Sequence, residues 1–277
     1  ERIGTFDRIY NLACAASPPQ YQKDPVHTTL TNVVGIHHAL ELSKRCGARI
    51  LQASTSEVYG DPECHPQPET YRGLVSCIGP RACYDEGKRC AESLMMDYAR
   101  SHGVEVRIAR IFNTYGPRMS AEDGRVISNF IVQALNDLPL TVYGDGSQTR
   151  SLCYVEDMID GLMSLMEQNF QTGPINLGNP EELTVLEIAE RVVGAVGGGR
   201  IVHKPLPVDD PRRRKPDTAL AQALLGFRAR VPFEEGLRKT VAYFGSELAR
   251  SRARIRSRAA IANDNGSSRA SSPRDDR

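Results

Sequence analysis

Tyr84 and Lys88 are the residues whose types and spacing most clearly indicate chemistry. Four residues apart on a helix, they lie on one face. A Lys ammonium beside a phenol favours the phenolate, which can take a proton from a hydroxyl group whose carbon gives up a hydride. An unassisted Tyr, with a pKa of about 10, is a poor base at neutral pH. The same spacing occurs in ordinary exposed Tyr–Lys pairs, so the surrounding elements must show whether this pair is catalytic.

Alternating strands and helices place this pair within a parallel sheet. The strand-like segments are 8–13, 49–53 and 104–111, and the helical segments are 24–46 and 83–102. This alternation with short connections is typical of a doubly wound α/β fold. Because ligands bind at the carboxyl ends of such strands, we expect residues 54–57 and 112–117 to form walls of a site.

The second half of the chain has a less regular order. It contains helical segments at 126–138, 156–168 and 184–196 and extended segments at 140–143 and 175–178. We therefore predict a partial dinucleotide-binding domain over 1–118, to which later strands can return, and a smaller α/β substrate-binding lobe over 119–249. The remaining residues, 250–277, lack a periodic apolar face and are predicted to be a disordered basic tail.

Composition and charge exclude several classes of protein. The chain has 35 Lys and Arg against 34 Asp and Glu, and seven cysteines with no zinc-like spacing, so we predict no metal site and a cytoplasmic, reducing environment. No apolar run is long enough to span a membrane. Positive charge gathers from Arg250 onward, with eight Arg and three Asp. A nucleic-acid role for this segment is possible, but a solvated tail is the favoured interpretation.

The glycine-rich loop of a dinucleotide-binding fold does not occur in the sequence. Neither Gly-x-x-Gly-x-x-Gly nor Gly-x-Gly-x-x-Gly is present, although such a loop lets a pyrophosphate approach a helix N-terminus. Glycines 197–199 follow a helix rather than join a strand to one. The simplest interpretation is an N-terminally truncated Rossmann-like sheet that lacks its first strand–helix units.

Several longer segments carry a resemblance to a known family. They are 54–62, 79–89, 109–118, 140–150, 176–182, 209–211 and 213–217. With these segments the chain resembles the extended short-chain dehydrogenases/reductases that act on nucleotide sugars, and among them the UDP-glucuronate decarboxylases. The pair Ser56-Glu57 after Thr55, and Arg214 before Lys215-Pro216, are the features that favour the decarboxylases over the related 4,6-dehydratases and 4-epimerases.

The resemblance implies roles for individual residues, with NAD as cofactor and a UDP-sugar as substrate. The implied catalytic residues are Thr55, Glu57, Tyr84, Lys88 and Arg214. The implied cofactor-binding residues are Leu12, Ala13, Thr31, Ser54, Tyr84 and Lys88. The implied substrate-binding residues are Asn113, Arg125, Tyr143, Gln148, Arg150 and Arg214. A plain alternative stays open at four of them. Glu57 can cap a turn or pair with a cation, and Arg214 can belong to a solvated basic face. Asn113 can merely shape its loop, and Tyr143 can stack on a base or pack in the core.

The implied reaction is NAD-dependent decarboxylation of UDP-glucuronate to UDP-xylose through a 4-keto intermediate. Another nucleotide-sugar dehydration or epimerisation stays open, as does a truncated UDP-sugar-binding or assembly subunit without catalysis. The resemblance also implies a homodimer in which the helices over 24–46 and 83–102 pair across a two-fold axis.

Overall fold

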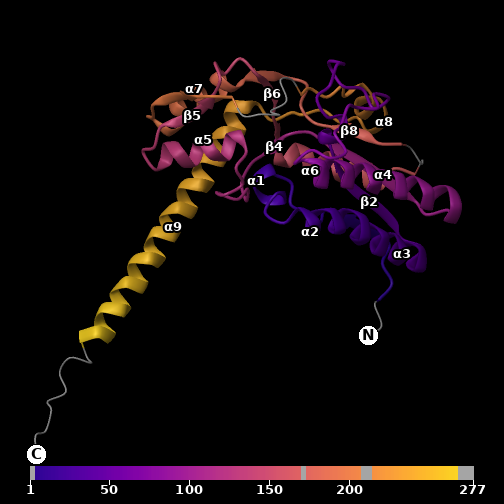
Figure 1. Cartoon of the computed structure of the whole chain (residues 1–277), viewed down its shortest axis with the longest axis horizontal. Coiled ribbons are helices and arrows are strands. Elements are labelled where there is room, and N and C mark those ends of the chain that lie inside the picture. Colours follow the sequence, from indigo (N-terminus) through magenta and orange to yellow (C-terminus); the bar gives the residue numbers. More distant parts are fainter. Residues whose placement is uncertain (1–3, 170–172, 207–213, 268–277) are drawn as a thin grey trace, which may run out of the picture.

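A four-stranded parallel sheet in the order β1-β2-β3-β8 positions the site (Figure 1). The computed structural model describes residues 4–169, 173–206 and 214–267. The strands are β1 (Arg8–Asn11), β2 (Arg49–Thr55), β3 (Val106–Ile111) and β8 (Ile175–Leu177). Thr55 lies opposite Ile111, and Ile111 lies opposite Leu177, so these three strands end at the same edge of the sheet. The predicted α/β class with a parallel sheet is confirmed.

Helices cover both faces of this sheet. One face carries α2 (Pro25–Leu30), the π-helical turn η1 (Thr31–Gly35), α3 (Ile36–Cys46) and α4 (Ala82–His102), and the other carries α6 (Val155–Glu167) and α8 (Ala219–Leu225). Successive strand residues point to opposite faces. Ile50 accordingly packs in a buried cluster with Ile36 and Met95, whereas Leu51 packs in another with Leu165.

Left-handed glycines end the helices that the sequence predicted. Gly47 ends α3 with φ +66°, and Gly103 ends α4 with φ +67°. Glycine adopts this conformation without the steric cost that a Cβ brings. The chain therefore turns sharply from α4 into β3. The first turns of α4 lie beside the carboxyl end of β2, where Lys88 donates to the carbonyl oxygen of Ala53.

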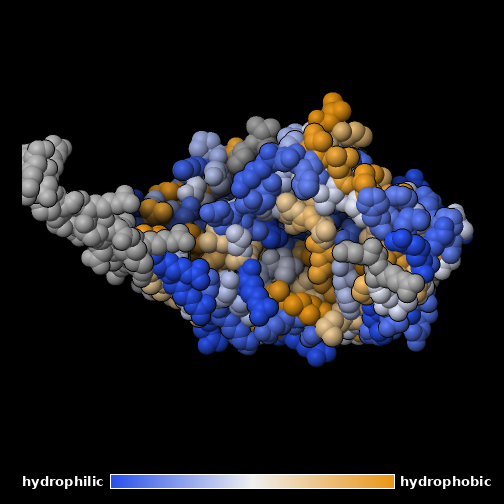
Figure 2. Space-filling model, turned by 90° about the horizontal axis from the view of Figure 1, so that it is seen from below, coloured by the Kyte–Doolittle hydropathy of each residue, from blue (hydrophilic) through white to orange (hydrophobic). Residues whose placement is uncertain are grey.

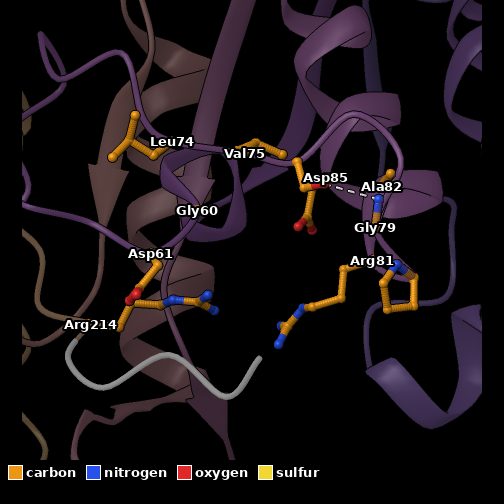
Figure 3. Close-up of a pocket in the computed structure, with 11 residues that line it drawn as sticks. Gly60, Asp61, Leu74, Val75, Gly79, Arg81, Ala82, Asp85 and Arg214 are labelled. Carbon is orange, nitrogen blue, oxygen red and sulfur yellow. Dashed lines mark hydrogen bonds between the residues drawn. The ribbon is translucent and has the colours of Figure 1, made fainter. Parts of the chain in front are cut away.

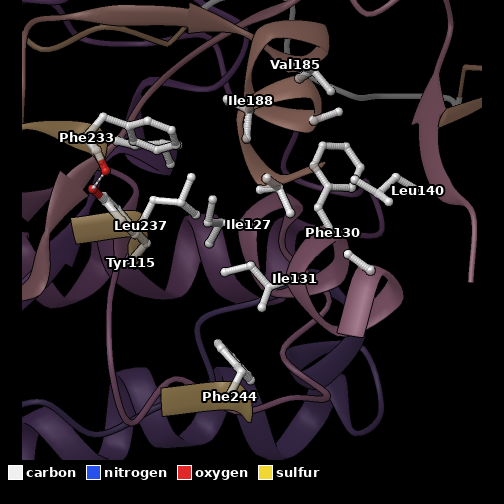
Figure 4. Close-up of a cluster of buried hydrophobic side chains, with 14 of the residues drawn as sticks. Tyr115, Ile127, Phe130, Ile131, Leu140, Val185, Ile188, Phe233, Leu237 and Phe244 are labelled. Carbon is white, nitrogen blue, oxygen red and sulfur yellow. Dashed lines mark hydrogen bonds between the residues drawn. The ribbon is translucent and has the colours of Figure 1, made fainter. Parts of the chain in front are cut away.

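A second hydrophobic core builds the lobe beside the sheet. Its elements, with the short ones that connect to the sheet, are α1 (Pro18–Tyr21), η2 (Ser56–Tyr59), β4 (Thr114–Tyr115), α5 (Val126–Leu135), β5 (Leu140–Tyr143), β6 (Thr149–Ser151), β7 (Cys153–Tyr154), β9 (Glu182–Thr184), α7 (Val185–Val196), β10 (Ile201–Lys204) and α9 (Phe233–Ser267). Figure 4 shows side chains from α5, α7 and α9 meeting, among them Ile131, Ile188 and Leu237. The lobe is thus held by its own core.

Sheet and lobe are interleaved along the chain. After α5 and β5 in the lobe, α6 and β8 return to the sheet, where Ala109 pairs with Ile175. The chain then enters the lobe again through α7 and β10, and α8 packs against β8. A later strand, β8, thus lies in the same sheet as β1, β2 and β3.

The C-terminal segment differs from the predicted disordered tail. Helix α9 continues to Ser267 and extends away from the rest of the molecule (Figure 1), so disorder is wrong for 250–267, while 268–277 lie outside the described residues. Ala and Arg have high helix propensity, and a helix already nucleated by packed residues such as Phe244 extends at little further cost. The segment has no periodic apolar face, which predicted that it is solvated, and residues 251–255 are indeed exposed.

No helix among the described residues combines the length and the apolar character that a membrane crossing needs.

Candidate active site

Tyr84 lies in the first turn of α4 and is buried, 4% exposed, at the end of β2. Its ring stacks on Tyr21 with centroids 4.8 Å apart, and its hydroxyl is within hydrogen-bond reach of Thr55. The structure thus brings together Thr55 and Tyr84, as predicted. Burial and the nearby Glu57 carboxylate raise the pKa of Tyr84, and they outweigh the opposing effects of Thr55 and Arg125.

Lys88 lies one turn further along the same face of α4. Its Nζ is 5.7 Å from the centroid of the Tyr84 ring and donates a hydrogen bond of 2.9 Å to the carbonyl oxygen of Ala53. Burial lowers the pKa of Lys88 to about 8. The four-residue spacing thus correctly predicted that Lys88 lies beside Tyr84. However, the expected preference for the phenolate is not met in this structure, because burial of both groups disfavours their charged forms.

Glu57 is a buried carboxylate held by two guanidinium groups. It is 8% exposed, with Oε2 2.8 Å from Arg81 Nη2 and Oε1 3.4 Å from Arg214 Nη1. Burial alone raises the pKa of Glu57, but Arg214 and Arg81 outweigh it and hold this pKa below its usual value. Glu57 therefore pairs with cations, which was the alternative to a catalytic role. One of these cations is Arg214, which the resemblance places in the same site.

Asp85 is a second carboxyl group in this cluster and was not predicted. It is 7% exposed and lies within hydrogen-bond reach of the side chain of Glu57. Burial and the Glu57 carboxylate raise the pKa of Asp85 to about 8, against the lowering effect of Arg81 and Arg214. Tyr84 and Asp85 thus place a phenol and a carboxyl group at the same helix terminus.

A cavity of about 400 Å³ adjoins the cluster. It lies between the sheet edge and the lobe, and Glu57 is in its wall. All six residues predicted to bind substrate line it: Asn113, Arg125, Tyr143, Gln148, Arg150 and Arg214. The fold therefore brings into one cavity six predicted residues that are up to 101 positions apart, between Asn113 and Arg214.

The lining residues differ in how they are held. Arg125 precedes α5 and contacts both carboxylate oxygens of Asp123, at 2.6 and 2.9 Å. Tyr143 ends β5 and is 41% exposed, so it does not pack in the core, and its carbonyl accepts a hydrogen bond of 2.8 Å from Gln148. Arg150 lies on β6 and donates to the carbonyl oxygen of Thr149. Arginines and an exposed aromatic ring are suited to a diphosphate and a nucleobase.

A smaller cavity, of about 270 Å³, lies on the other side of the same wall. Asp85, Arg81 and Arg214 line it, with Asp61 and Ser76 from the long loop before α4. Figure 3 shows the carboxyl group of Asp85 and the guanidinium groups of Arg81 and Arg214 turned toward one space. Arg81 and Arg214 also line the larger cavity, so the two cavities share a charged wall.

The predicted cofactor-binding residues are partly brought together. Leu12 and Ala13 are exposed just after β1, and Leu12 is 57% exposed. Thr31 lies on η1, where its side-chain hydroxyl hydrogen-bonds His27 rather than Tyr84 or Lys88. Ser54 donates its hydroxyl to Glu92. The structure therefore directs Ser54 away from Tyr84, because neighbouring strand residues alternate in direction and Thr55 faces that side.

These residues fit one end of a nicotinamide dinucleotide. An exposed apolar Leu12 at the end of β1, with Tyr84 and Lys88 beyond β2, suits the nicotinamide and its ribose. The pyrophosphate end has no glycine-rich loop in this sequence. The fit thus covers the reactive end of the cofactor, and Leu12, Thr55, Tyr84 and Lys88 are the residues that would hold it.

Sequence reasoning missed Arg81, Asp85 and Tyr21. Arg81 and Asp85 flank Tyr84, but an acidic residue in the first turn of a helix is ordinarily explained by the helix dipole. Tyr21 follows two prolines in a short helix without a periodic pattern. Only burial distinguishes Asp85 and Tyr21 from surface residues, and the burial of a polar side chain is not visible in one sequence.

Comparison with known proteins assigns a family to these features. Residues 3–240 match the family model described as GDP-mannose 4,6 dehydratase. The chain is 60% identical over 232 residues to UDP-glucuronic acid decarboxylase 3 of Arabidopsis thaliana, which covers 83% of this chain and 68% of that protein. It is 57% identical over 243 residues to UDP-glucuronic acid decarboxylase 1 of Danio rerio, covering 87% of this chain and 58% of that protein.

Solved structures agree on the fold. UDP-glucose 4-epimerase of Thermotoga maritima, with UDP-glucose, superposes with a TM-score of 0.81 at 28% identity, over 87% of this chain and 78% of that one. UDP-glucuronic acid 4-epimerase of Bacillus cereus, in complex with UDP-glucuronic acid and NAD, gives 0.76 at 27% identity, over 86% and 74%.

The chain spans little more than half the length of the Danio rerio relative, 58%. Its match to the family model nevertheless covers the sheet, the lobe and every described residue of the two cavities. With Tyr84, Lys88 and Thr55 joined at the sheet edge, this match shows that the chain belongs to the GDP-mannose 4,6 dehydratase family of extended short-chain dehydrogenases/reductases, alongside UDP-glucuronic acid decarboxylases.

Proposed function

We propose that this chain carries the substrate site and catalytic groups of a UDP-glucuronate decarboxylase that releases UDP-xylose. The observation that carries the proposal is the buried Glu57–Arg214 pair in the wall of the 400 Å³ cavity. The names of the relatives at 57 and 60% identity support the same reaction. A uronic acid brings a carboxylate into this wall, and guanidinium groups are suited to hold it.

The first chemical step needs a base and a hydride acceptor. Tyr84 takes the proton of the sugar 4-hydroxyl, which Thr55 orients, and Lys88 lies beside the phenol. Leu12, Thr55, Tyr84 and Lys88 would hold NAD, which would supply a reversible hydride acceptor and a positive charge that favours the phenolate. Lys88 and Thr55 hold the phenol in position throughout.

The second step belongs to the Glu57 side of the cavity. A ketone at carbon 4 accepts the electrons of the breaking bond between carbons 5 and 6, so carbon dioxide leaves. Arg214 holds the departing carboxylate, and Glu57 handles the proton that carbon 5 then requires. Residues Arg125, Arg150, Gln148 and Tyr143 hold the nucleotide at the other end of the cavity.

The test is product analysis on the purified chain with NAD and UDP-glucuronate. We expect carbon dioxide and a UDP-pentose, and in Tyr84→Phe a rate lower by about 10²- to 10⁴-fold. A UDP-4-keto-6-deoxy sugar or an epimer from the corresponding substrate would instead support a dehydratase or epimerase. Binding of UDP-glucuronate without turnover, at saturating NAD, would support a sugar-binding subunit.

We also propose that a second copy of the chain docks on the face formed by α2 and η1, which pack against α4. Val26, Leu30 and Val34, four residues apart and 68%, 52% and 41% exposed, form one apolar stripe. Figure 2 shows hydrophobic side chains exposed among hydrophilic ones on one face of the molecule. Sedimentation should give a dimer at micromolar concentration and a monomer for Leu30→Lys. A monomeric parent chain contradicts the proposal.

A further inference from the structure

The wall between the two cavities contains a pair of carboxyl groups that belong to different sides. Glu57 lines the 400 Å³ cavity, and Asp85 lines the 270 Å³ cavity. Arg81 and Arg214 line both. The small cavity reaches the surface, since Asp61 and Ser76 in its lining are exposed. The pair is therefore a polar connection between solvent and the substrate cavity.

The contact between these carboxyl groups requires a proton. The side chains of Glu57 and Asp85 lie within hydrogen-bond reach of each other, and two ionised carboxylates could only accept. Both residues are buried, at 8% and 7% exposure. Like charges side by side in a buried place disfavour ionisation of both groups. The pair accordingly holds one proton at neutral pH.

The surroundings place this proton on the Asp85 side. The charged and titratable groups facing Asp85 are Glu57 from η2, Arg81 at the start of α4, Arg214 before α8 and Tyr21 from α1. The guanidinium groups of Arg81 and Arg214 are closer to Glu57 than to Asp85, and they contact Glu57 at 2.8 and 3.4 Å. Asp85 Oδ1 has no hydrogen-bond partner among the described residues. Burial and Glu57 accordingly raise the pKa of Asp85 to about 8.

We propose that Asp85 stores the proton that Glu57 delivers to the substrate, and that the small cavity renews it from solvent. This inference rests on the proposed decarboxylation. Asp85 is a positioning residue in the strict sense, because it acts through Glu57 and does not line the substrate cavity.

The proton balance of the reaction agrees with this arrangement. When the bond between carbons 5 and 6 breaks, its electron pair stays on the sugar as an enolate and neutral carbon dioxide leaves. The Asp85 proton moves to the Glu57 carboxylate, carbon 5 takes it from Glu57, and water in the small cavity reprotonates Asp85. Each turnover thus takes up one proton from solvent, and it enters from the side opposite the substrate.

The test has a readout that needs no turnover. Infrared difference spectra of the chain alone, between pH 6 and about 9, should show the C=O stretch of a neutral carboxylic acid that disappears around pH 8, the value to which the pKa of Asp85 is raised. Asp85→Asn should lack this band. Glu57→Gln should lack it at pH 7, because Asp85 then faces two guanidinium groups without a competing carboxylate. The control Asp97→Asn, the same change on the exposed part of α4, should keep it.

Turnover supplies the second readout. The kcat of the parent chain should fall by about tenfold per pH unit above pH 8, as one protonated group is lost. Asp85→Asn should lower kcat by about 100-fold with little change in KM for UDP-glucuronate, and the limb near pH 8 should vanish. Asp97→Asn should keep the kcat of the parent chain and its decrease above pH 8. Circular dichroism checks that each variant is folded.

The possible outcomes separate the two proposals. Absence of the infrared band in the parent chain overturns the stored proton, whatever the activity. A band in the parent chain, with kcat and its pH dependence unchanged in Asp85→Asn, overturns the delivery of that proton. A band without any UDP-pentose from the parent chain contradicts the proposed function and leaves the stored proton in place. If Asp85→Asn does not fold, loss of the infrared band in Glu57→Gln at pH 7 tests whether the band comes from this carboxyl pair.

Discussion

Helix α4 contacts two buried arginine–carboxylate clusters, and they differ in how completely their polar atoms are satisfied. The Glu57 cluster consists of Glu57, Arg81, Asp85 and Arg214. The Glu92 cluster consists of Ser54, Tyr59, Glu92, Arg110 and Asn176. In the Glu92 cluster, Arg110 contacts both oxygens of Glu92, at 2.7 and 3.0 Å, and also donates to the Tyr59 hydroxyl and the Glu69 carbonyl oxygen.

The Glu57 cluster leaves polar capacity unused. Arg214 contacts Glu57 at 3.4 Å, its buried Nε has no partner among the described residues, and the same holds for Asp85 Oδ1. Both clusters are buried. The Glu57 cluster lines the two cavities described above, and no member of the Glu92 cluster is among their lining residues. A buried ion pair with every atom satisfied stabilises a fold, whereas unsatisfied atoms facing a cavity are available to a ligand.

Glu92→Gln should produce the largest loss of stability. The change leaves the Arg110 guanidinium buried with neutral partners only, which costs about 3–5 kcal/mol when a buried pair loses one member. Urea unfolding of parent and variant measures the difference. Turnover per folded molecule should change little, and a loss below about 1 kcal/mol contradicts the structural role of this cluster.

Arg214→Lys should lower kcat/KM by about 100-fold, or roughly 2.7 kcal/mol, because an ammonium group cannot replace the planar fork. The free energy of unfolding should change by less than about 1 kcal/mol, since the contact with Glu57 is long. Steady-state kinetics and urea unfolding are measured together. An unfolding loss as large as that of Glu92→Gln would erase the distinction between the clusters.

Tyr59→Phe should have an intermediate effect on stability. The Tyr59 hydroxyl donates to Asn176 Oδ1 at 2.7 Å and accepts from Arg110. Its removal leaves a buried amide oxygen without that donor, which costs about 1–2 kcal/mol. Thermal unfolding measures the effect. Turnover lowered by more than about threefold would show that the Glu92 cluster reaches the active site.

Asp97→Asn should have the smallest effect. Asp97 pairs with Arg100 on the exposed part of α4, and solvent screens such a pair. Both the free energy of unfolding and kcat/KM should match the parent chain within experimental error. A clear effect of this change would mean that charge alone, rather than burial, distinguishes the clusters.

Local patterns predicted most of the fold. The bounds of α4, α7 and β5 agree with the expected segments to within a residue, because apolar periodicity and terminal glycines act over a few residues. The tail was wrong for 250–267, since helix α9 continues from packed residues rather than from its own apolar face. Spacing on one helix also predicted the neighbourhood of Tyr84 and Lys88.

The sequence by itself determined the sheet, the helix that carries Tyr84 and Lys88, and the set of residues around the cavity, because periodicity and family motifs lie along the chain. Only the tertiary structure decided which carboxyl groups are buried and in contact. Glu57 and Asp85 are 28 positions apart and Arg214 lies far beyond both, so their shared burial, and the pKa that follows from it, exist only when sheet, loop and lobe close on one another.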